Sequence, residues 1–319
     1  MESGTYASVS GNGVWPGQVT SNDITDSEGK FIQRFLGTAN RSFSSVEPGP
    51  RDATGTLTYF PQDMRIPFWT IGSVVDTSGT NSVHTVTEIN SNVRQSAFTS
   101  GLLNPPFSFT LEDSKVGPTA GSNFIRTING CVPMTFTINA KQNEKVEVDV
   151  DYVGQTLTYS SGASTAVTAY ASRPYLWSDV TFTFSGTVLQ TAKEIEFEAT
   201  QSTEAPHYLN GSRDISVPYQ ADRDYTLTLT MDWEATTSKD IYQTIFKGSG
   251  AFNCVFDLNA DSSAGSQHAT FYLSGCRIIT AEIPSPFEGT NEAKITMRPQ
   301  FVGGSAYDFQ AGNSRYNPY

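Results

Sequence analysis

A pattern of residues around Cys131 returns around Cys276, 145 residues later (276 − 131). Each copy runs from an apolar segment through a polar, Gly-containing stretch to a Gly-Cys pair, and then through an alternating segment to a second glycine. The first copy begins at Phe107 and the second at Phe252, with the same offset. The repetition of this pattern predicts two similar β-domains in tandem. The residues that define the repeat are Gly130, Cys131, Gly154, Gly275, Cys276 and Gly303.

The repeat divides the 319 residues into two domains with extensions. We expect an N-terminal arm at 1–30, a first β-domain at 31–155 with an insertion at about 73–106, a linker at 156–176, a second β-domain at 177–303 and a C-terminal tail at 304–319. The arm is polar, and the tail carries aromatic residues among polar ones. Both are expected to become ordered by docking on a neighbour.

The residue types predict an all-β fold, with tandem sandwich or barrel domains that each carry one short helix. Thr, Ser, Val, Phe and Tyr are abundant, and Gly, Pro, Asn and Asp interrupt short runs. Segments such as 146–152, 180–185, 195–199 and 225–231 alternate with period two, which is typical of half-buried strands. A helix is expected at about 237–248, which ends at Gly248. Its counterpart near 63–71 contains Pro67 and should be shorter or broken.

The sequence indicates no catalytic, cofactor-binding or metal-binding site, and we expect no enzyme activity. The three histidines, His84, His207 and His268, occur in no metal-ligand or nucleophile motif. The net charge of −12 disfavours a surface that neutralises nucleic-acid phosphates. Cys131 and Cys276 would lie in separate domains as free, buried thiols in a reducing cytoplasm. No secretory signal or membrane-spanning stretch is evident, so no membrane anchoring is expected.

Glu147, Asp149 and Asp151 alternate along one predicted strand, so their carboxylates share one face. This face could be solvated, could line a passage, or could bind a cation, although hard-cation sites usually draw their ligands from a turning loop. The corresponding face of the second copy reads Glu292, Lys294, Thr296 and Arg298, which is mixed in charge.

The segment from Asn129-Gly130-Cys131 to Val153-Gly154, within a β-rich chain with a short helix, resembles the tail tube proteins of long-tailed double-stranded DNA viruses of bacteria and archaea. The second copy keeps Gly275-Cys276 and Phe301-Val302-Gly303 but has Pro284 and Pro286 between them. The resemblance covers most of residues 31–304.

The resemblance implies a structural virion protein whose rings stack into a tube around a channel for the genome. Two tube-like domains per chain would give a homotrimeric ring with pseudo-sixfold symmetry, and a hexamer is the alternative. The strand of Glu147, Asp149 and Asp151 would face the lumen, where DNA passes without specific binding. Tape-measure, terminator and distal tail proteins are the implied partners, and the tail of the virion, made in the host cytoplasm, is the implied location.

Two other functions stay open at this point. A tail terminator or distal tail ring would use a similar domain but form one ring and stop. A secreted carbohydrate-binding sandwich belongs to a different class, and the missing signal sequence and the free cysteines disfavour it.

Overall fold

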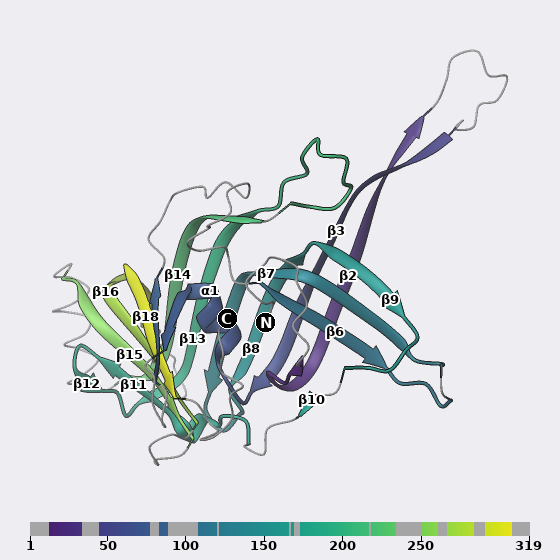
Figure 1. Ribbon diagram of the computed structural model, residues 1–319. Coiled ribbons are helices and arrows are strands. Elements are labelled where there is room, and N and C mark those ends of the chain that lie inside the picture. The colour runs from purple at the N-terminus through teal and green to yellow at the C-terminus, as the bar shows by residue number, and fades with distance from the viewer. Residues whose placement is uncertain are drawn as a thin grey trace.

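The computed structural model describes residues 13–33, 45–76, 83–88, 108–119, 121–165, 167–168, 173–216, 218–233, 250–260, 267–283 and 291–307. The fold is nearly all β (Figure 1). Phe107 and the helix expected at 237–248 lie outside the described residues.

The strands of the first half of the chain are β1 (Gly13–Val14), β2 (Gly17–Gln33), β3 (Ser45–Pro61), β4 (Gly72–Asp76), β5 (Val83–Glu88), β6 (Phe109–Lys115), β7 (Phe124–Lys141), β8 (Glu147–Gly154), β9 (Thr156–Ser160) and β10 (Val167–Thr168). Those of the second half are β11 (Val180–Phe184), β12 (Thr187–Val188), β13 (Ala192–Glu204), β14 (Tyr219–Asp232), β15 (Phe252–Asn259), β16 (His268–Glu282), β17 (Glu292–Arg298) and β18 (Phe301–Tyr307).

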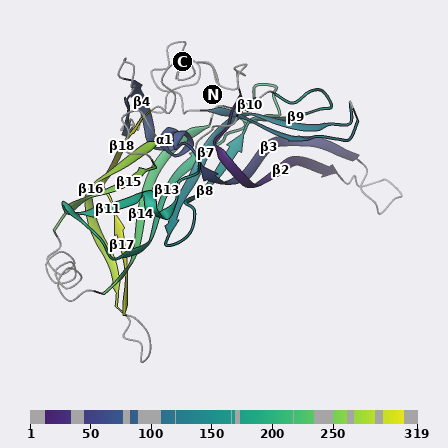
Figure 2. The same ribbon diagram turned by 90° about the horizontal axis from the view of Figure 1, so that it is seen from below.

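Eight antiparallel strands form a continuous layer, which we call the main layer. Its order is β16–β17–β14–β13–β7–β8–β3–β2. Seen from below, the layer runs as an arc from β16 and β17 at one end to β3 and β2 at the other (Figure 2). The distal part of the β2–β3 hairpin extends well beyond the rest of the molecule (Figure 1).

Further strands pair outside the main layer. Beside the second half of the chain the order is β12–β11–β15–β16–β18–β5–β4, and beside the first half β6 and β9 flank β7. Both β7 and β16 therefore pair with outer strands along their first part and with the main layer along their second.

The two halves of the chain repeat one order of strand pairing. In the first half β2 pairs β3, β3 pairs β8, β8 pairs β7, and β7 pairs both β6 and β9. In the second half β13 pairs β14, β14 pairs β17, β17 pairs β16, and β16 pairs both β15 and β18. Each of these six strands of the first half thus has a counterpart among the six of the second.

The Gly-Cys pairs lie where β7 and β16 pass from the outer strands to the main layer. Gly130 has φ 67° and Gly275 has φ 65°, a left-handed conformation that suits glycine because it has no Cβ. The thiol of Cys131 donates to Ile128 O at 3.6 Å, and that of Cys276 donates to Leu273 O at 3.3 Å. The same bend, held by the same local contact, therefore occurs in both strands.

The strand registers change two of the sequence alignments. Phe109 pairs with Cys131 as Phe252 pairs with Cys276, so the counterpart of Phe252 is Phe109 and not Phe107. Gly154 ends β8, whereas Gly303 lies within β18, the counterpart of β9, so these two glycines are not equivalent. Gly154 has its own reason to be glycine, because a Cβ there would lie 2.2 Å from Ile128 Cγ2.

Several boundaries also differ from those expected. Residues 17–30 of the expected arm form most of β2, which follows β3 along its length. The expected insertion contains β4 and β5, which extend the outer strands through β18. The expected linker begins with β9, and β18 takes in the first residues of the expected tail. These segments were misplaced because short polar strands are fixed by their pairing partners more than by their own residues.

Aromatic side chains fill the core between the main layer and the outer strands. Phe197 is fully buried, with its ring centroid 5.6 Å from that of Phe136 and 5.7 Å from that of Phe271. Phe271 also stacks on Phe68 at 4.7 Å. Phe68 and Phe136 come from the first half of the chain and Phe197 and Phe271 from the second, so the two halves share one core.

Phe68 belongs to the helix α1 (Arg65–Ile71), which forms despite Pro67. Pro67 lies in the first turn, where its missing N–H breaks no intrahelical bond. At the other end, Gln201 on β13 donates to Thr70 O and Arg223 on β14 donates to Ile71 O. A helix from the first half is thus capped by strands of the second.

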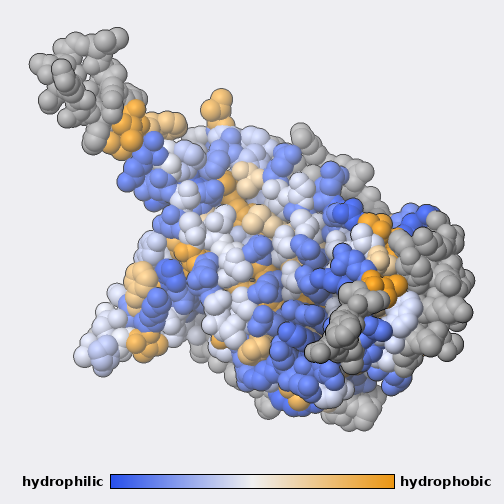
Figure 3. Space-filling view, turned by 180° about the vertical axis from the view of Figure 1, so that it is seen from behind, coloured by the Kyte–Doolittle hydropathy of each residue, from blue (hydrophilic) through white to orange (hydrophobic). Residues whose placement is uncertain are grey.

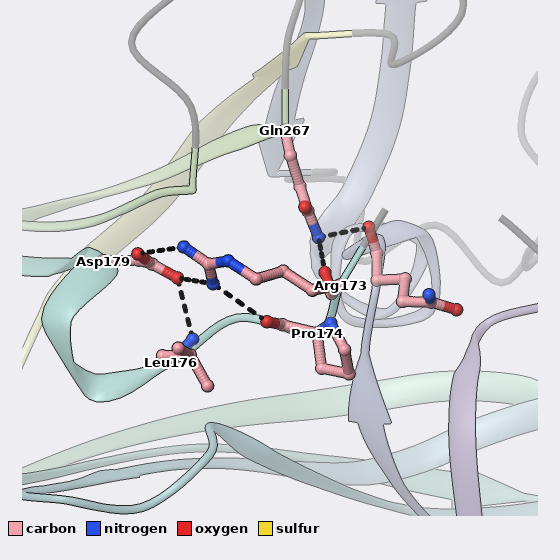
Figure 4. Close-up of polar contacts among 6 residues, drawn as sticks. Arg173, Pro174, Leu176, Asp179 and Gln267 are labelled. Carbon is pink, nitrogen blue, oxygen red and sulfur yellow. Dashed lines mark hydrogen bonds and ion pairs between the residues drawn. The ribbon is translucent and has the colours of Figure 1, made fainter. Parts of the chain in front are cut away.

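The segment at 173–179 is held against both halves of the chain (Figure 4). The guanidinium of Arg173 pairs with Asp179 at 2.5 and 2.8 Å, and Asp179 also accepts from Leu176 N. The buried amide of Gln267 donates to Arg173 O and to Gln62 O at 2.9 and 3.0 Å. The last residues of the expected linker, 173–176, therefore lie in a hydrogen-bonded bridge between the two halves.

Candidate functional site

The main layer has one apolar face, which packs on the core, and one polar face. On β8 the side chains of Val148, Val150 and Tyr152 are fully buried, and those of Glu147, Asp149 and Asp151 point to the opposite side. The pattern is the same on β13, where Ile195, Phe197 and Ala199 are buried and Glu194, Glu196 and Glu198 alternate with them. We call these six carboxylates the acidic patch.

Strand register brings the two triplets of the acidic patch onto one surface. Between β8 and β13 runs the second part of β7, whose Thr137 lies opposite both Asp149 and Glu198. Two residues further along β7, on the same face, Asn139 lies opposite both Glu147 and Glu196. The patch therefore spans three adjacent strands that come from both halves of the chain.

Threonine hydroxyls on β3 continue this surface and orient two of its carboxylates. Thr56 donates to Asp151 and Thr58 donates to Asp149, each at 2.6 Å. The pKa of Glu147 is raised from its ordinary value, first because partial burial disfavours the charged form, and further by repulsion from Asp149 and Glu144. The surface thus keeps carboxylates close together, with hydroxyl donors as the nearest partners of two of them.

The counterpart of β8 in the second half, β17, presents a mixed face, as the sequence indicates. Glu292, Lys294, Thr296 and Arg298 alternate with buried residues on β17. Arg298 pairs with Asp224 on β14 at 3.1 Å, and Glu292 accepts from Lys193 at 2.7 Å. The polar face therefore changes from acidic near β8 and β13 to mixed near β17.

Sequence reasoning identified the β8 triplet but missed Glu194, Glu196 and Glu198. Their signal was available, because the carboxylates alternate with apolar residues over 194–199. What the sequence does not reveal is that β13 pairs with β7, which places this triplet beside the other one.

The remaining candidates form no catalytic constellation that we can identify in the described part of the chain. His268 lies 2.7 Å from Asp257, which also accepts from Thr270, and His207 is exposed in a loop. His84 lies on β5, beside β18. Cys131, Cys254 and Cys276 are buried, free thiols. Among the described residues no group of three or more His, Cys, Asp or Glu side chains is placed to hold a metal ion.

Much of the remaining surface is hydrophilic, but apolar residues gather at the far end of the β2–β3 hairpin (Figure 3). There Phe31 and Ile32 are 59% and 62% exposed, and Val46 on the opposite strand is also exposed. Within the described residues, no helix has the length and apolar character that a membrane crossing requires.

A family model described as "Phage tail tube protein" matches residues 5–311 of the chain. Because the match covers nearly all of the 319 residues, the chain belongs to this family. No curated protein matches the sequence. The chain is therefore a structural protein of the phage tail tube, a component of the virion that assembles with itself and with other tail proteins.

Proposed function

We propose that three copies of this chain close into a ring with pseudo-sixfold symmetry, that rings stack into the tail tube, and that the polar face of the main layer lines the channel. Each chain would contribute two equivalent units, one built on β2, β3 and β6–β9 and one on β13–β18. The repeated order of strand pairing supports this division, and 3 × 2 units give the six positions of the ring. A ring of six chains is the alternative, in which one unit of each chain decorates the outside.

The acidic patch is the observation that carries the channel assignment. Its carboxylates lie on the face opposite the core, in the middle of the longest continuous layer of the molecule. Duplex DNA carries a dense negative charge and binds surfaces from which Lys and Arg release its counterions. The carboxylates and threonine hydroxyls of the patch give DNA no such attraction, and Lys193 and Arg298 on the mixed face are paired with carboxylates, so the genome would pass without being held. Tape-measure, terminator and distal tail proteins would be the partners within the virion.

Electron microscopy of the purified protein tests the assembly. Hollow rings or stacked tubes with three-fold modulation are expected. True six-fold rings would contradict the trimer and keep the tube. Single rings that never stack would favour a terminator or distal ring instead.

A charge reversal tests the channel assignment. The variant Glu196→Lys with Glu198→Lys should assemble into tails of normal length but eject DNA more slowly, because the new cations attract the duplex. The matched control is Glu204→Lys with Asp222→Lys, which makes the same change in charge at exposed positions near the far end of the β13–β14 hairpin. Equal ejection by both variants would show that the acidic patch does not face the DNA.

A further inference from the structure

The main layer ends in two strand edges that have no partner among the described residues. At one end β2 pairs only with β3. At the other end the second part of β16, from Arg277 to Glu282, pairs only with β17. Unpaired edges expose backbone N–H and C=O groups and are templates for pairing with another chain. Ile24 on β2 and Ile283, next to β16, are only partly buried against the core.

The chain already contains one example of how such edges join. The second part of β7 pairs with β13 over seven residue pairs, from Glu194 opposite Lys141 to Thr200 opposite Thr135. Here β7 is the counterpart of β16, and β13 is the counterpart of β2. The β7–β13 junction inside the chain is therefore a template for a β16–β2 junction between two chains.

The template fixes a register. Phe136 on β7 and Ala281 on β16 are counterparts in the β7–β8 and β16–β17 pairings. In each strand a bulge lies two residues before that position. Because β8 and β17 are counterparts, their pairings with β3 and β14 align β3 with β14. The β2–β3 and β13–β14 pairings then make Asp26 on β2 the counterpart of Ala199 on β13. Since Ala199 lies opposite Phe136, Asp26 of one chain would lie opposite Ala281 of the next. The neighbouring pairs follow by alternation: Ser27 with Thr280, Thr25 with Glu282 and Ile24 with Ile283.

The side chains favour this register independently of the template. Over the four pairs from Ser27 with Thr280 to Ile24 with Ile283, the only ones of this edge that the template covers, it places Ile24 beside Ile283 on the core side and opposes no two like charges. A slip of two residues keeps the same faces. In one direction it sets Asp23 opposite Glu282, which is destabilising because both are acidic. In the other direction it sets Asp26 opposite Ile283, which would press a carboxylate against an apolar side chain.

We infer that the second part of β16 in one chain pairs antiparallel with β2 of a second copy, with Ser27 opposite Thr280, so that the main layers of neighbouring chains form one continuous sheet. This inference rests on the proposed ring and specifies how that ring closes.

Cysteine cross-linking on assembled rings or virion tails tests this register. Residues directly opposite in an antiparallel pair have Cα atoms about 4.5–5.5 Å apart, within disulfide reach, whereas diagonal neighbours lie about 7–8 Å apart. Ser27→Cys with Thr280→Cys should therefore link chains on mild oxidation, as linked species on non-reducing gels. The matched slipped pairs, Ser27→Cys with Glu282→Cys and Thr25→Cys with Thr280→Cys, should link at least about ten times more slowly.

The outcomes separate this inference from the proposed function. Rings or tubes that link fastest through a slipped pair would overturn the register. Visible rings that link through none of the pairs would overturn the junction and leave the tube function intact. If virion tails contained no rings of this protein, the proposed function would fail and the junction with it.

Discussion

The bend at Gly275 gives a stability prediction whose size follows from the structure. In the variant Gly275→Ala the residue keeps φ near 65°, which costs an L-residue about 1–2 kcal/mol, less about 0.4–1 kcal/mol returned by the stiffer unfolded chain. The new Cβ would also lie 2.9 Å from Gln300 Cβ. Gln300 cannot withdraw freely, because its backbone N–H donates to Ser274 O at 2.9 Å. Overpacking of this kind costs about 1–3 kcal/mol, so the terms together give an expected loss of about 1–4.5 kcal/mol.

Gly186→Ala is the matched control for that variant. Gly186 has φ 84°, but nothing lies within 4 Å of a Cβ built there, so this variant carries the backbone cost alone, about 1 kcal/mol. Urea unfolding of the wild type and both variants, followed by tryptophan fluorescence, measures the difference in the free energy of unfolding. The reasoning is refuted if Gly275→Ala loses no more stability than Gly186→Ala. A third variant, Gly275→Asn, tolerates the left-handed conformation better but keeps the Cβ contact, and should fall between the two.

Two further predictions concern the acidic patch and the shared core. Because the pKa of Glu147 is raised in the folded state, its ionised form is disfavoured there, and Glu147→Gln should increase the free energy of unfolding at pH 7. The gain should disappear as the pH falls below about 4, where the carboxyl is protonated in both states. Asp149→Asn relieves the repulsion on Glu147 but weakens the bond from Thr58, so it should give a smaller gain at pH 7. Phe197→Ala should cost about 3–5 kcal/mol in thermal or urea unfolding, because Phe197 is fully buried between rings from both halves of the chain. A loss below about 1 kcal/mol would contradict a shared core.

The sequence predicts the local elements of this fold well. Alternation over 146–152, 195–199 and 225–231 corresponds to β8, β13 and β14, and the all-β class is confirmed. The Gly-Cys pairs mark the two bends because the left-handed conformation restricts the residue type. Gly154 and Gly303 also follow similar residues in the sequence, but they lie in strands that are not counterparts. A shared residue type is a weaker guide than a shared pairing partner.

Long-range pairing could not be predicted from the sequence. Nothing in residues 192–204 identifies β7 as the partner of β13, and nothing in residues 72–88 identifies β18 as the partner of β5. These strands find their partners through the packing of the whole layer, not through their own residue pattern. This is why half of the acidic patch was recognised and its neighbouring triplet was not. Whether the patch faces DNA stays a prediction.

The course of β7 and β16 through both sets of strands has a mechanical consequence. In a sandwich whose layers are separate strands, only side-chain contacts oppose a force that slides one layer past the other. Here each half of the chain has one strand that passes from the outer strands into the main layer at Gly130 or Gly275. Sliding would have to stretch a continuous covalent backbone and break the hydrogen bonds on both sides of the bend. A long, thin assembly built from such units would resist shear through its peptide backbone as well as through its core.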